Sequence, residues 1–379
     1  MLTAAVIFTA TYLVVALGRA PGIRLDRTGA AVVGAAFMVA FHVVTPEQAY
    51  GMVDLGTLVL LFGTMVIVGH LRLAGFFRWV AAVVARRAAS PRRLLAGLVA
   101  VAGLLSAVFV NDTVCLALTP LVLEVSAALG VRATPYLLAL ATASNIGSAA
   151  TLTGNPQNML IGVASGISYR RFFAALAPVA LLGLIIDFLV IALVYRRELA
   201  LPFTARAEPR ARLHPFLTLK SLAASVAMIA FFFAGANVSM VAFTAGAALL
   251  LTRRVKPEKV FLEINWNLLT LFAGLFVVVG AARTAGVTDA LFDVLHAREA
   301  RGVASLAAAV AGLSNLVSNV PAVMLFASSS PTSPILTGRG SPWPWPPRWP
   351  AISPSSAPSP TSSSSRERAA NARSASGST

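Results

Sequence analysis

Long apolar runs, separated by short loops, fill the chain from residue 1 to residue 326 and limit what it can fold into. Only 12% of the residues are charged and 57% are hydrophobic, whereas a water-soluble domain carries about a quarter charged residues. A membrane-spanning helix needs about 20 apolar residues, so the runs allow roughly ten crossings or partial crossings. We therefore expect an all-α polytopic protein of the inner membrane. The runs cover residues 1–17 and about 28–44, 53–71, 94–110, 114–129, 133–152, 172–195, 216–234, 237–252, 264–282 and 303–318.

The basic residues lie mostly in the loops between these runs, and the formal net charge is +16. In a soluble protein such a charge would suggest a nucleic-acid partner, but between membrane spans Lys and Arg set the orientation of the chain. The first loop carries Arg19, Arg24 and Arg27, residues 72–93 carry six arginines, and residues 45–52 carry no basic residue. Because basic loops stay in the cytoplasm, we expect a multi-pass protein with its N-terminus outside and no nucleic-acid partner.

Several classes of site find no support in the residue pattern. The one cysteine, Cys115, excludes an intrachain disulfide framework and a cysteine-based zinc cluster. The four histidines are scattered without metal-ligand spacing, and no nucleophile–base pair or phosphate-binding loop occurs. We therefore expect no enzymatic activity and no cofactor beyond a coupling ion. Residues 1–17 lack the charged leading region of a signal peptide, so we expect them to remain as a span.

The chain also repeats part of its own sequence, as many transporters do. A Gly-x5-Gly-x2-Arg-x2-Gly pattern begins at Gly63 and recurs 211 residues later at Gly274. Two polar residues recur at a spacing of 208, Ser106 as Ser314 and Asn111 as Asn319. We expect a transmembrane domain over residues 1–326, with a first repeat over about 50–200 and an incomplete second repeat over about 260–326.

Three polar clusters interrupt the apolar runs: Val110–Val114, Ala143–Asn158 and Ser314–Pro321. A lipid-facing polar group costs several kcal/mol, so such clusters are expected to face the protein interior or a water-filled cavity. Gly154 and Pro156 lie among amides and hydroxyls, which indicates a span that unwinds partway and frees backbone groups to hold ions. The alternative is that the polar side chains only join helices and that the proline only kinks one.

Asp112 is the only acidic residue in these clusters. A carboxylate in the membrane is costly unless it meets a cation or takes up a proton, which makes Asp112 the best candidate for the coupling ion. The alternative is a structural pairing with the neighbouring amide and hydroxyl groups. Asp187, alone in the run 172–195, is a weaker candidate because it could face another helix.

Two motifs give the chain a family resemblance. Asn111-Asp-Thr113 followed by Thr119-Pro120, and then Ser144-Asn-Ile-Gly-Ser-Ala-Ala-Thr-Leu-Thr-Gly-Asn-Pro-Gln-Asn-Met159, resembles the ion transporter superfamily. That group includes divalent-anion:sodium symporters, citrate-type carriers, arsenite pumps, sodium/proton antiporters and the melanosomal P protein. The resemblance covers most of residues 50–326.

This resemblance implies two inverted repeats, each with a re-entrant hairpin and a broken helix that meet near the middle of the membrane. Residues 111–113 would form the first hairpin tip, residues 144–158 the first broken helix, and Ser318 with Asn319 the second tip. The second repeat would then be incomplete, because no second broken helix follows in the sequence.

We therefore expect secondary active transport of a small inorganic or carboxylate anion, coupled to Na⁺ or H⁺ and working by alternating access in the lipid bilayer. Asn111, Asp112 and Asn145 would hold Na⁺ if that is the coupling ion. The alternatives are a sodium/proton antiporter in which Asp112 exchanges the two cations, and an inactive truncated remnant. A homodimer is left open. The candidate ligand residues are Asn111, Asp112, Thr113, Ser144, Asn145, Thr151, Thr153, Gly154, Asn155, Pro156, Asn158, Ser318 and Asn319.

Residues 327–379 have a different composition, with 16 serines and 10 prolines, and cannot bury a core or span lipid. We expect a disordered tail that arose from a reading-frame shift near Phe326. In the shifted frame, residues 350–365 permit the string GNLTLLGSVANLIVV, whose TLLGSVAN parallels residues 151–158 of the first broken helix. Any Ser/Pro-rich stretch turns apolar in that frame, so a genuine disordered extension is the alternative.

Overall fold

The computed structural model describes residues 1–19, 22, 24–203, 213–252, 254–288, 290, 311–312, 314–315 and 319–327. The described residues form helices and no strands, which confirms the expected all-α polytopic class. Two expectations lie outside these residues: the second hairpin tip at Ser318, and the tail beyond Ala327.

The described helices differ widely in length. α4, α6, α7, α10, α11 and α14 are each long and apolar enough to cross a membrane, and α1, α2 and α12 are shorter apolar helices. In chain order they are α1 (Leu2–Leu17), α2 (Arg27–Ala40), α3 (Pro46–Met52), α4 (Leu55–Leu73), α5 (Phe76–Arg87), α6 (Pro91–Val108), α7 (Asn111–Leu129), α8 (Thr134–Ser148), α9 (Pro156–Ser165), α10 (Tyr169–Val194), a 3₁₀ turn η1 (Glu198–Ala200), α11 (Pro215–Phe233), α12 (Val238–Leu250), α13 (Pro257–Phe261), α14 (Trp266–Thr284) and α17 (Asn319–Ala327).

Helices α4 and α14 begin and end on equivalent residues. Asp54 and Asn265 each accept, through Oδ1, a hydrogen bond from the backbone N–H three residues on, at 3.2 and 3.1 Å. Such side chains satisfy the free N–H groups of a first helical turn. Gly75 and Gly286 each follow two residues after the end of their helix, with φ of 79° and 75°. Glycine favours this left-handed conformation, which stops the helix.

The recurrence extends beyond this pair of helices. A shift of 211 residues carries Leu55–Leu73 onto Trp266–Thr284 residue for residue. The same shift carries the first residue of α2 onto the first residue of α12, and the first residue of α3 onto the first residue of α13. Because α2 ends at Ala40 and α3 begins at Pro46, the recurrence reaches upstream of residue 50, the expected start of the first repeat.

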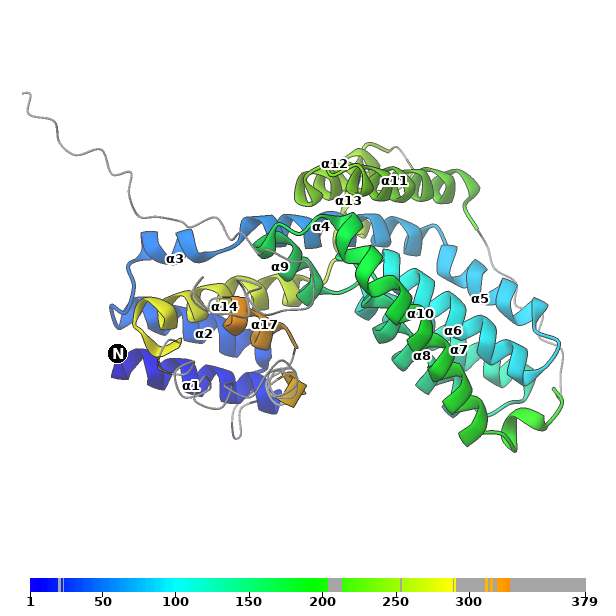
Figure 1. The fold of residues 1–379 in the computed structure, drawn as a ribbon. Helices are drawn as coiled ribbons and strands as arrows, with labels where there is room; N and C mark the ends of the chain where they lie inside the picture. Colours follow the sequence, from blue (N-terminus) through cyan, green and yellow to red (C-terminus); the bar gives the residue numbers. More distant parts are fainter. Residues whose placement is uncertain are drawn as a thin grey trace, which may run out of the picture.

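The two equivalent helices, α4 and α14, each pack against a helix from the other repeat. α4 packs on α12, and α14 packs on α2. Figure 1 shows α4 running from α3 toward α5, while α14 runs in the opposite direction. The two equivalent helices therefore have inverted orientations, as in an inverted-repeat transporter.

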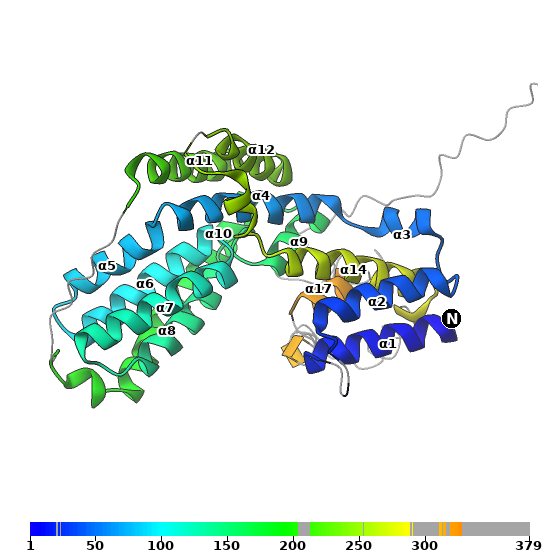
Figure 2. The same ribbon diagram turned by 180° about the vertical axis from the view of Figure 1, so that it is seen from behind.

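Most of the described helices fall into two groups. α5, α6, α7, α8 and α10 form one group, and α1, α2, α14 and α17 form the other (Figures 1 and 2). α4 runs alongside both groups, and α11 and α12 cover its outer side. α9 lies between the two groups, where it contacts α4 and α17.

A hairpin and an interrupted helix position the candidate site. α6 and α7 are joined by a two-residue turn, Phe109–Val110, so the two helices fold back on each other. α8 ends at Ser148 and α9 begins at Pro156, which leaves residues 149–155 outside any helix. The hairpin approaches the interrupted helix closely, because a Cβ on Gly147 would lie 2.6 Å from the carbonyl carbon of Gly103. Small residues permit such close approach of membrane helices.

Candidate functional site

Two hydrogen bonds from Asn111 join the tip of the hairpin to the interrupted helix. Its backbone N–H donates to the Gly154 carbonyl at 3.0 Å, and its side-chain Nδ2 donates to Asn145 Oδ1 at 2.7 Å. Asn111 is the first residue of α7, and its side chain is buried. The structure therefore brings together candidate residues that are 34 and 43 positions apart in the chain.

Side chains satisfy the backbone groups that the break between α8 and α9 exposes. Asn158 Nδ2 donates to the carbonyl of Ser148 at 3.1 Å and to that of Thr151 at 2.9 Å. The Thr151 hydroxyl donates to the carbonyl of Ala107 in the hairpin and accepts from the N–H of Gly154 at 3.0 Å. These bonds satisfy backbone groups of an irregular segment that lies between two buried helix ends.

Gly154 lies where no side chain fits. A Cβ at this position would overlap the Ser148 carbonyl oxygen and lie 2.7 Å from the Ser106 carbonyl oxygen. The closest real Cβ contacts are longer than this, so any larger residue would displace the hairpin or the end of α8. Gly154 therefore has a packing role in addition to its expected role in the unwound segment.

Two buried oxygen atoms at the hairpin tip have no hydrogen-bond partner among the described residues. These atoms are Asn111 Oδ1 and Ser106 Oγ. The equivalent residues of the second repeat hydrogen-bond to each other, with the Ser314 hydroxyl donating to Asn319 Oδ1 at 2.6 Å. An unsatisfied buried oxygen costs about 1–3 kcal/mol unless a ligand or water meets it. The first repeat therefore keeps two oxygen atoms available where the second repeat pairs them.

The remaining candidate residues divide by exposure. Five are buried around the break: Ser144, Thr151, Thr153, Asn155 and Pro156. Thr113 and Asn158 are half-buried, whereas Asp112 and Asn145 are exposed. An exposed carboxylate in a membrane span requires water, a cation or another protein group beside it.

The second-repeat candidates are less fully described. Asn319 begins α17 and is exposed, and α17 packs against α9 and α14. No hydrogen bond joins Asn319 to the first-repeat candidates in the part of the chain that the structure describes. The predicted meeting of the two tips thus stays a prediction.

Three contacts of the site come from residues that the sequence motifs do not include. The Tyr169 hydroxyl lies 3.1 Å from Thr153 Oγ1, and Cys115 Sγ lies 2.8 Å from Ser144 Oγ. Ser106 places its carbonyl oxygen against Gly154, and its own hydroxyl has no partner among the described residues. The recurrence of Ser106 as Ser314 could have revealed the last of these. Nothing in the sequence pattern distinguishes Tyr169 or Cys115 from ordinary packing residues.

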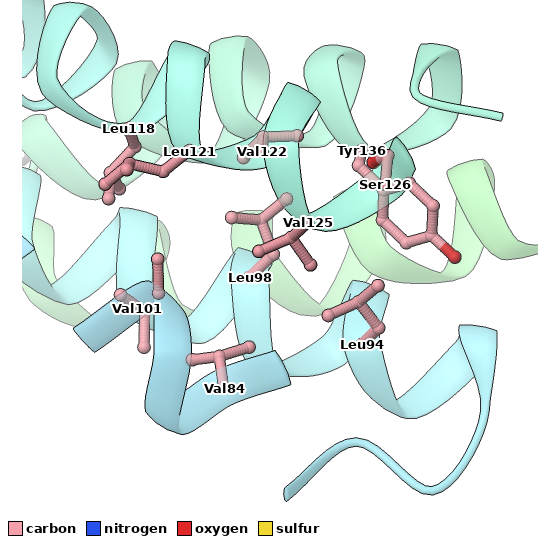
Figure 3. Close-up of a pocket in the computed structure, with 11 residues that line it drawn as sticks. Val84, Leu94, Leu98, Val101, Leu118, Leu121, Val122, Val125, Ser126 and Tyr136 are labelled. Atoms are coloured by element: carbon pink, nitrogen blue, oxygen red, sulfur yellow. The ribbon is translucent and has the colours of Figure 1, made fainter. Parts of the chain in front are cut away.

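A small cavity on the far side of the hairpin has a different character. It lies between α5, α6, α7 and α8 and is lined almost entirely by aliphatic side chains (Figure 3). Its polar lining groups are the Tyr136 hydroxyl, which donates to the Pro91 carbonyl at 3.3 Å, and the buried Ser126 hydroxyl, for which the described residues provide no partner. Such a lining suits apolar packing and offers no set of groups for an ion.

Comparison with known proteins agrees with this architecture. The family model described as "Citrate transporter" matches residues 7–345, which is most of the chain. The chain belongs to the citrate transporter family. The expected membership of the ion transporter superfamily is thereby confirmed, and the protein is a multi-pass membrane transporter rather than an enzyme.

Relatives of this citrate transporter family member are also transporters by name. A silicon efflux transporter of Oryza sativa subsp. japonica is 32% identical, over 80% of this chain and 76% of its own length. An uncharacterized transporter of Mycobacterium tuberculosis is 30% identical, over 84% and 78% respectively. An uncharacterized transporter of Synechocystis is 26% identical, over 79% and 71%. These relatives support transport and leave the substrate open.

Proposed function

We propose that the protein is a secondary active transporter that carries a small inorganic or carboxylate anion across the inner membrane, coupled to Na⁺ or H⁺. The observation that carries the proposal is the pair of hydrogen bonds by which Asn111 fixes the hairpin tip to the broken helix. A tip and an unwound segment joined in this way place free oxygens, a carboxylate and a helix N-terminus close together within membrane-spanning helices. Transporters bind their substrates and coupling ions at such interrupted helices.

Oxygen atoms at the tip would hold the coupling cation. Asn111 Oδ1 is buried without a partner among the described residues, and Asp112 and Asn145, next to it in the chain and across its amide hydrogen bond, are exposed. Amide and carboxylate oxygens suit Na⁺, and the Asp112 carboxylate could instead take up a proton. A cation at this place would satisfy the unpartnered amide oxygen and the exposed carboxylate together.

The start of α9 would hold the anion. Asn155, the residue before the helix, makes no capping hydrogen bond through its side chain, and Pro156 has no N–H to donate. The remaining N–H groups of the first turn carry the partial positive charge of the helix dipole. A cation at the adjacent tip would strengthen binding of an anion there, which couples the two substrates. The silicon efflux relative favours a small inorganic substrate.

Alternating access would follow from two bodies that move relative to each other. The hairpin and the broken helix are bonded together and would move as one body. The reciprocal contacts of α4 with α12 and of α14 with α2 would form the other, stationary body. In the orientation expected from the basic residues, the N-terminus would lie outside, and the arginine-containing segments 19–27 and 72–93 would lie in the cytoplasm.

A sodium/proton antiporter is the second candidate function. It is favoured by the exposed Asp112 carboxylate beside the unpartnered Asn111 oxygen, since one carboxylate can exchange Na⁺ for H⁺ without an anion. An inactive remnant is the third candidate, and it predicts a protein that moves neither anions nor cations.

Uptake into proteoliposomes separates these candidates. Purified protein would be reconstituted and given labelled silicate, arsenite, phosphate or citrate with an imposed Na⁺ gradient, an imposed pH gradient or neither. Gradient-dependent accumulation of an anion supports the proposal. Sodium-driven proton movement with no anion requirement supports the antiporter, and the absence of all fluxes from folded protein supports the remnant.

A further inference from the structure

A basic cavity lies away from the proposed transport site. It has a volume of about 810 Å³ and opens where α4 ends, α11 begins and the connection from α12 to α13 passes. Its lining includes the exposed side chains of His214, Arg254, Lys256 and Lys259. None of the described lining residues is acidic. The cavity therefore presents concentrated positive charge to an anionic group.

Among the described residues, no carboxylate forms an ion pair with the cations of this cavity. Glu263, on the α13–α14 connection, forms an ion pair with Arg72 at 2.8 Å. Lys220 donates through Nζ to the Leu251 carbonyl at 2.8 Å and so satisfies the end of α12. Glu258 of α13 is exposed and forms no ion pair among the described residues. Arg254, Lys256 and Lys259 likewise form none with described carboxylates, which leaves them free to bind a ligand.

The exposed ring of Phe216 lines the same cavity, and further exposed apolar side chains lie on the connections at either end of α13. The guanidinium of Arg254 lies 5.2 Å from the ring centre of Phe216, and that ring is itself exposed. Leu251 and Leu262 are 82% and 84% exposed, each on a connection that flanks α13. Trp266 donates its indole N–H to the Phe261 carbonyl at 3.0 Å. Tryptophan is typical of the membrane–water interface, where the polar headgroups of lipids meet their acyl chains.

We propose that this cavity binds the phosphate headgroup of an anionic phospholipid, while the apolar border contacts the acyl chains. The backbone N–H of His214 donates to the Ala74 carbonyl at 3.0 Å, so the cavity adjoins the end of α4. This end leads into the arginine-rich segment, residues 72–93, which carries six arginines. On the expected orientation this end faces the cytoplasm, where anionic lipids attract basic segments near the membrane. The combination of cations and exposed apolar groups favours an amphiphile over a free inorganic anion.

Lipid binding to the full chain in neutral detergent tests this proposal. Native mass spectrometry and thermal unfolding would be recorded with phosphatidylglycerol, phosphatidylcholine or inorganic phosphate. We expect phosphatidylglycerol alone to remain bound and to raise the melting temperature. The triple variant Arg254→Gln, Lys256→Gln, Lys259→Gln should bind it about 100-fold more weakly, because each cation near the membrane surface contributes about fivefold. Phe216→Ala should also weaken lipid binding while leaving the charges in place.

A charge-matched variant provides the control. Arg86→Gln, Arg87→Gln, Arg92→Gln removes three exposed cations from the arginine-rich segment and should leave phosphatidylglycerol binding unchanged. Elution from a sizing column and the lipid-free melting temperature establish that each variant is folded. Equal loss in both triple variants would mean diffuse attraction and would overturn the proposal. Stabilisation by inorganic phosphate as strong as that by phosphatidylglycerol would also overturn it, because the site would then serve a free anion.

Discussion

Gly63 of α4 lies directly against the backbone of Ala242 in α12, so that a Cβ on Gly63 would sit 2.7 Å from the next backbone nitrogen of α12. The equivalent contact, with the partners exchanged, lies 211 residues away. A Cβ on Gly274 would lie 2.8 Å from the carbonyl group of Ala31. Each repeat therefore supplies the glycine for one crossing and the alanine for the other.

A second pair of contacts obeys the same exchange. A Cβ on Gly69 would lie 3.2 Å from Glu263, and a Cβ on Gly280 would lie 2.6 Å from Met52. The shift of 211 residues carries Gly69 onto Gly280 and Met52 onto Glu263, so it relates one contact to the other. Reciprocal contacts of this kind indicate that the two repeats pack around a common pseudo-two-fold axis.

Replacement of Gly63 by leucine should destabilise the protein strongly. The added side chain meets backbone that cannot move aside as a flexible side chain could, and overpacking of this kind costs about 3 kcal/mol. Gly51→Leu is the matched control, because Gly51 is also helical and nothing lies within 4 Å of its Cβ position. Thermal unfolding in detergent measures both. A melting temperature of Gly63→Leu equal to that of Gly51→Leu would contradict the close crossing.

Parts of this architecture can be predicted from the sequence because local chemistry dictates them. Pro156 has no N–H for an interior helical position and stands first in α9, so a break falls within the predicted residues 144–158, although α8 already ends at Ser148. The family resemblance, rather than the polar pattern, leads to a hairpin tip at residues 111–113, and the turn itself is the apolar Phe109–Val110 directly before them.

Other parts depend on partners that the sequence does not name. The contact between Gly103 and Gly147 requires knowing how two helices cross, and Tyr169 meets Thr153 only because α10 returns past the break. The recurrence of α2 as α12 shows little residue identity. It rests on helix caps instead, since Asp26 and Asn237 each bond to the N–H three residues on.

Loss of the Asn158 side chain should destabilise the break between α8 and α9. Asn158→Ala leaves the carbonyls of Ser148 and Thr151 without the amide that now bonds them, at a cost of about 2 kcal/mol. Gln157→Ala, one position earlier and also half-buried, should cost less. Chemical unfolding of the two variants, followed by circular dichroism, compares them. Equal stabilities would show that water replaces the amide and that the break is open to solvent.

Replacement of Gly154 should abolish ligand binding. Gly154→Leu drives a side chain into the Ser148 carbonyl and against the Ser106 carbonyl, which separates the hairpin tip from the broken helix. A thermal-shift screen against anions and cations would first identify a ligand of the wild-type protein. Isothermal titration would then compare affinities, with Gly51→Leu as the control for a bulky side chain elsewhere. Unchanged affinity in Gly154→Leu would return the segment to the role of a helix kink.

The Asn111 side chain should matter for the cation more than for the fold. Asn111→Ala removes both the bond to Asn145 and the unpartnered oxygen, and should weaken Na⁺ dependence of transport by tenfold or more, corresponding to about 1.4 kcal/mol. Ser126→Ala, which removes an unpartnered hydroxyl on the far side of the hairpin, is the control. The measurement is the Na⁺ concentration that gives half-maximal uptake. A parallel change in the two variants would assign the effect to hairpin packing.

Asp112→Asn should uncouple transport from the ion gradient while the protein still inserts and purifies. The carboxylate is exposed at the tip of the α6–α7 hairpin, and asparagine keeps its size while removing the charge that would bind Na⁺ or exchange H⁺. Gradient-driven accumulation should be lost, whereas exchange of labelled for unlabelled substrate across the membrane, which needs no net ion movement, should persist. Asp187→Asn, in the membrane-spanning α10, is the matched control and should retain coupling. Wild-type coupling stoichiometry in Asp112→Asn would remove Asp112 from the cation site, and loss of coupling in Asp187→Asn instead would transfer that role to α10.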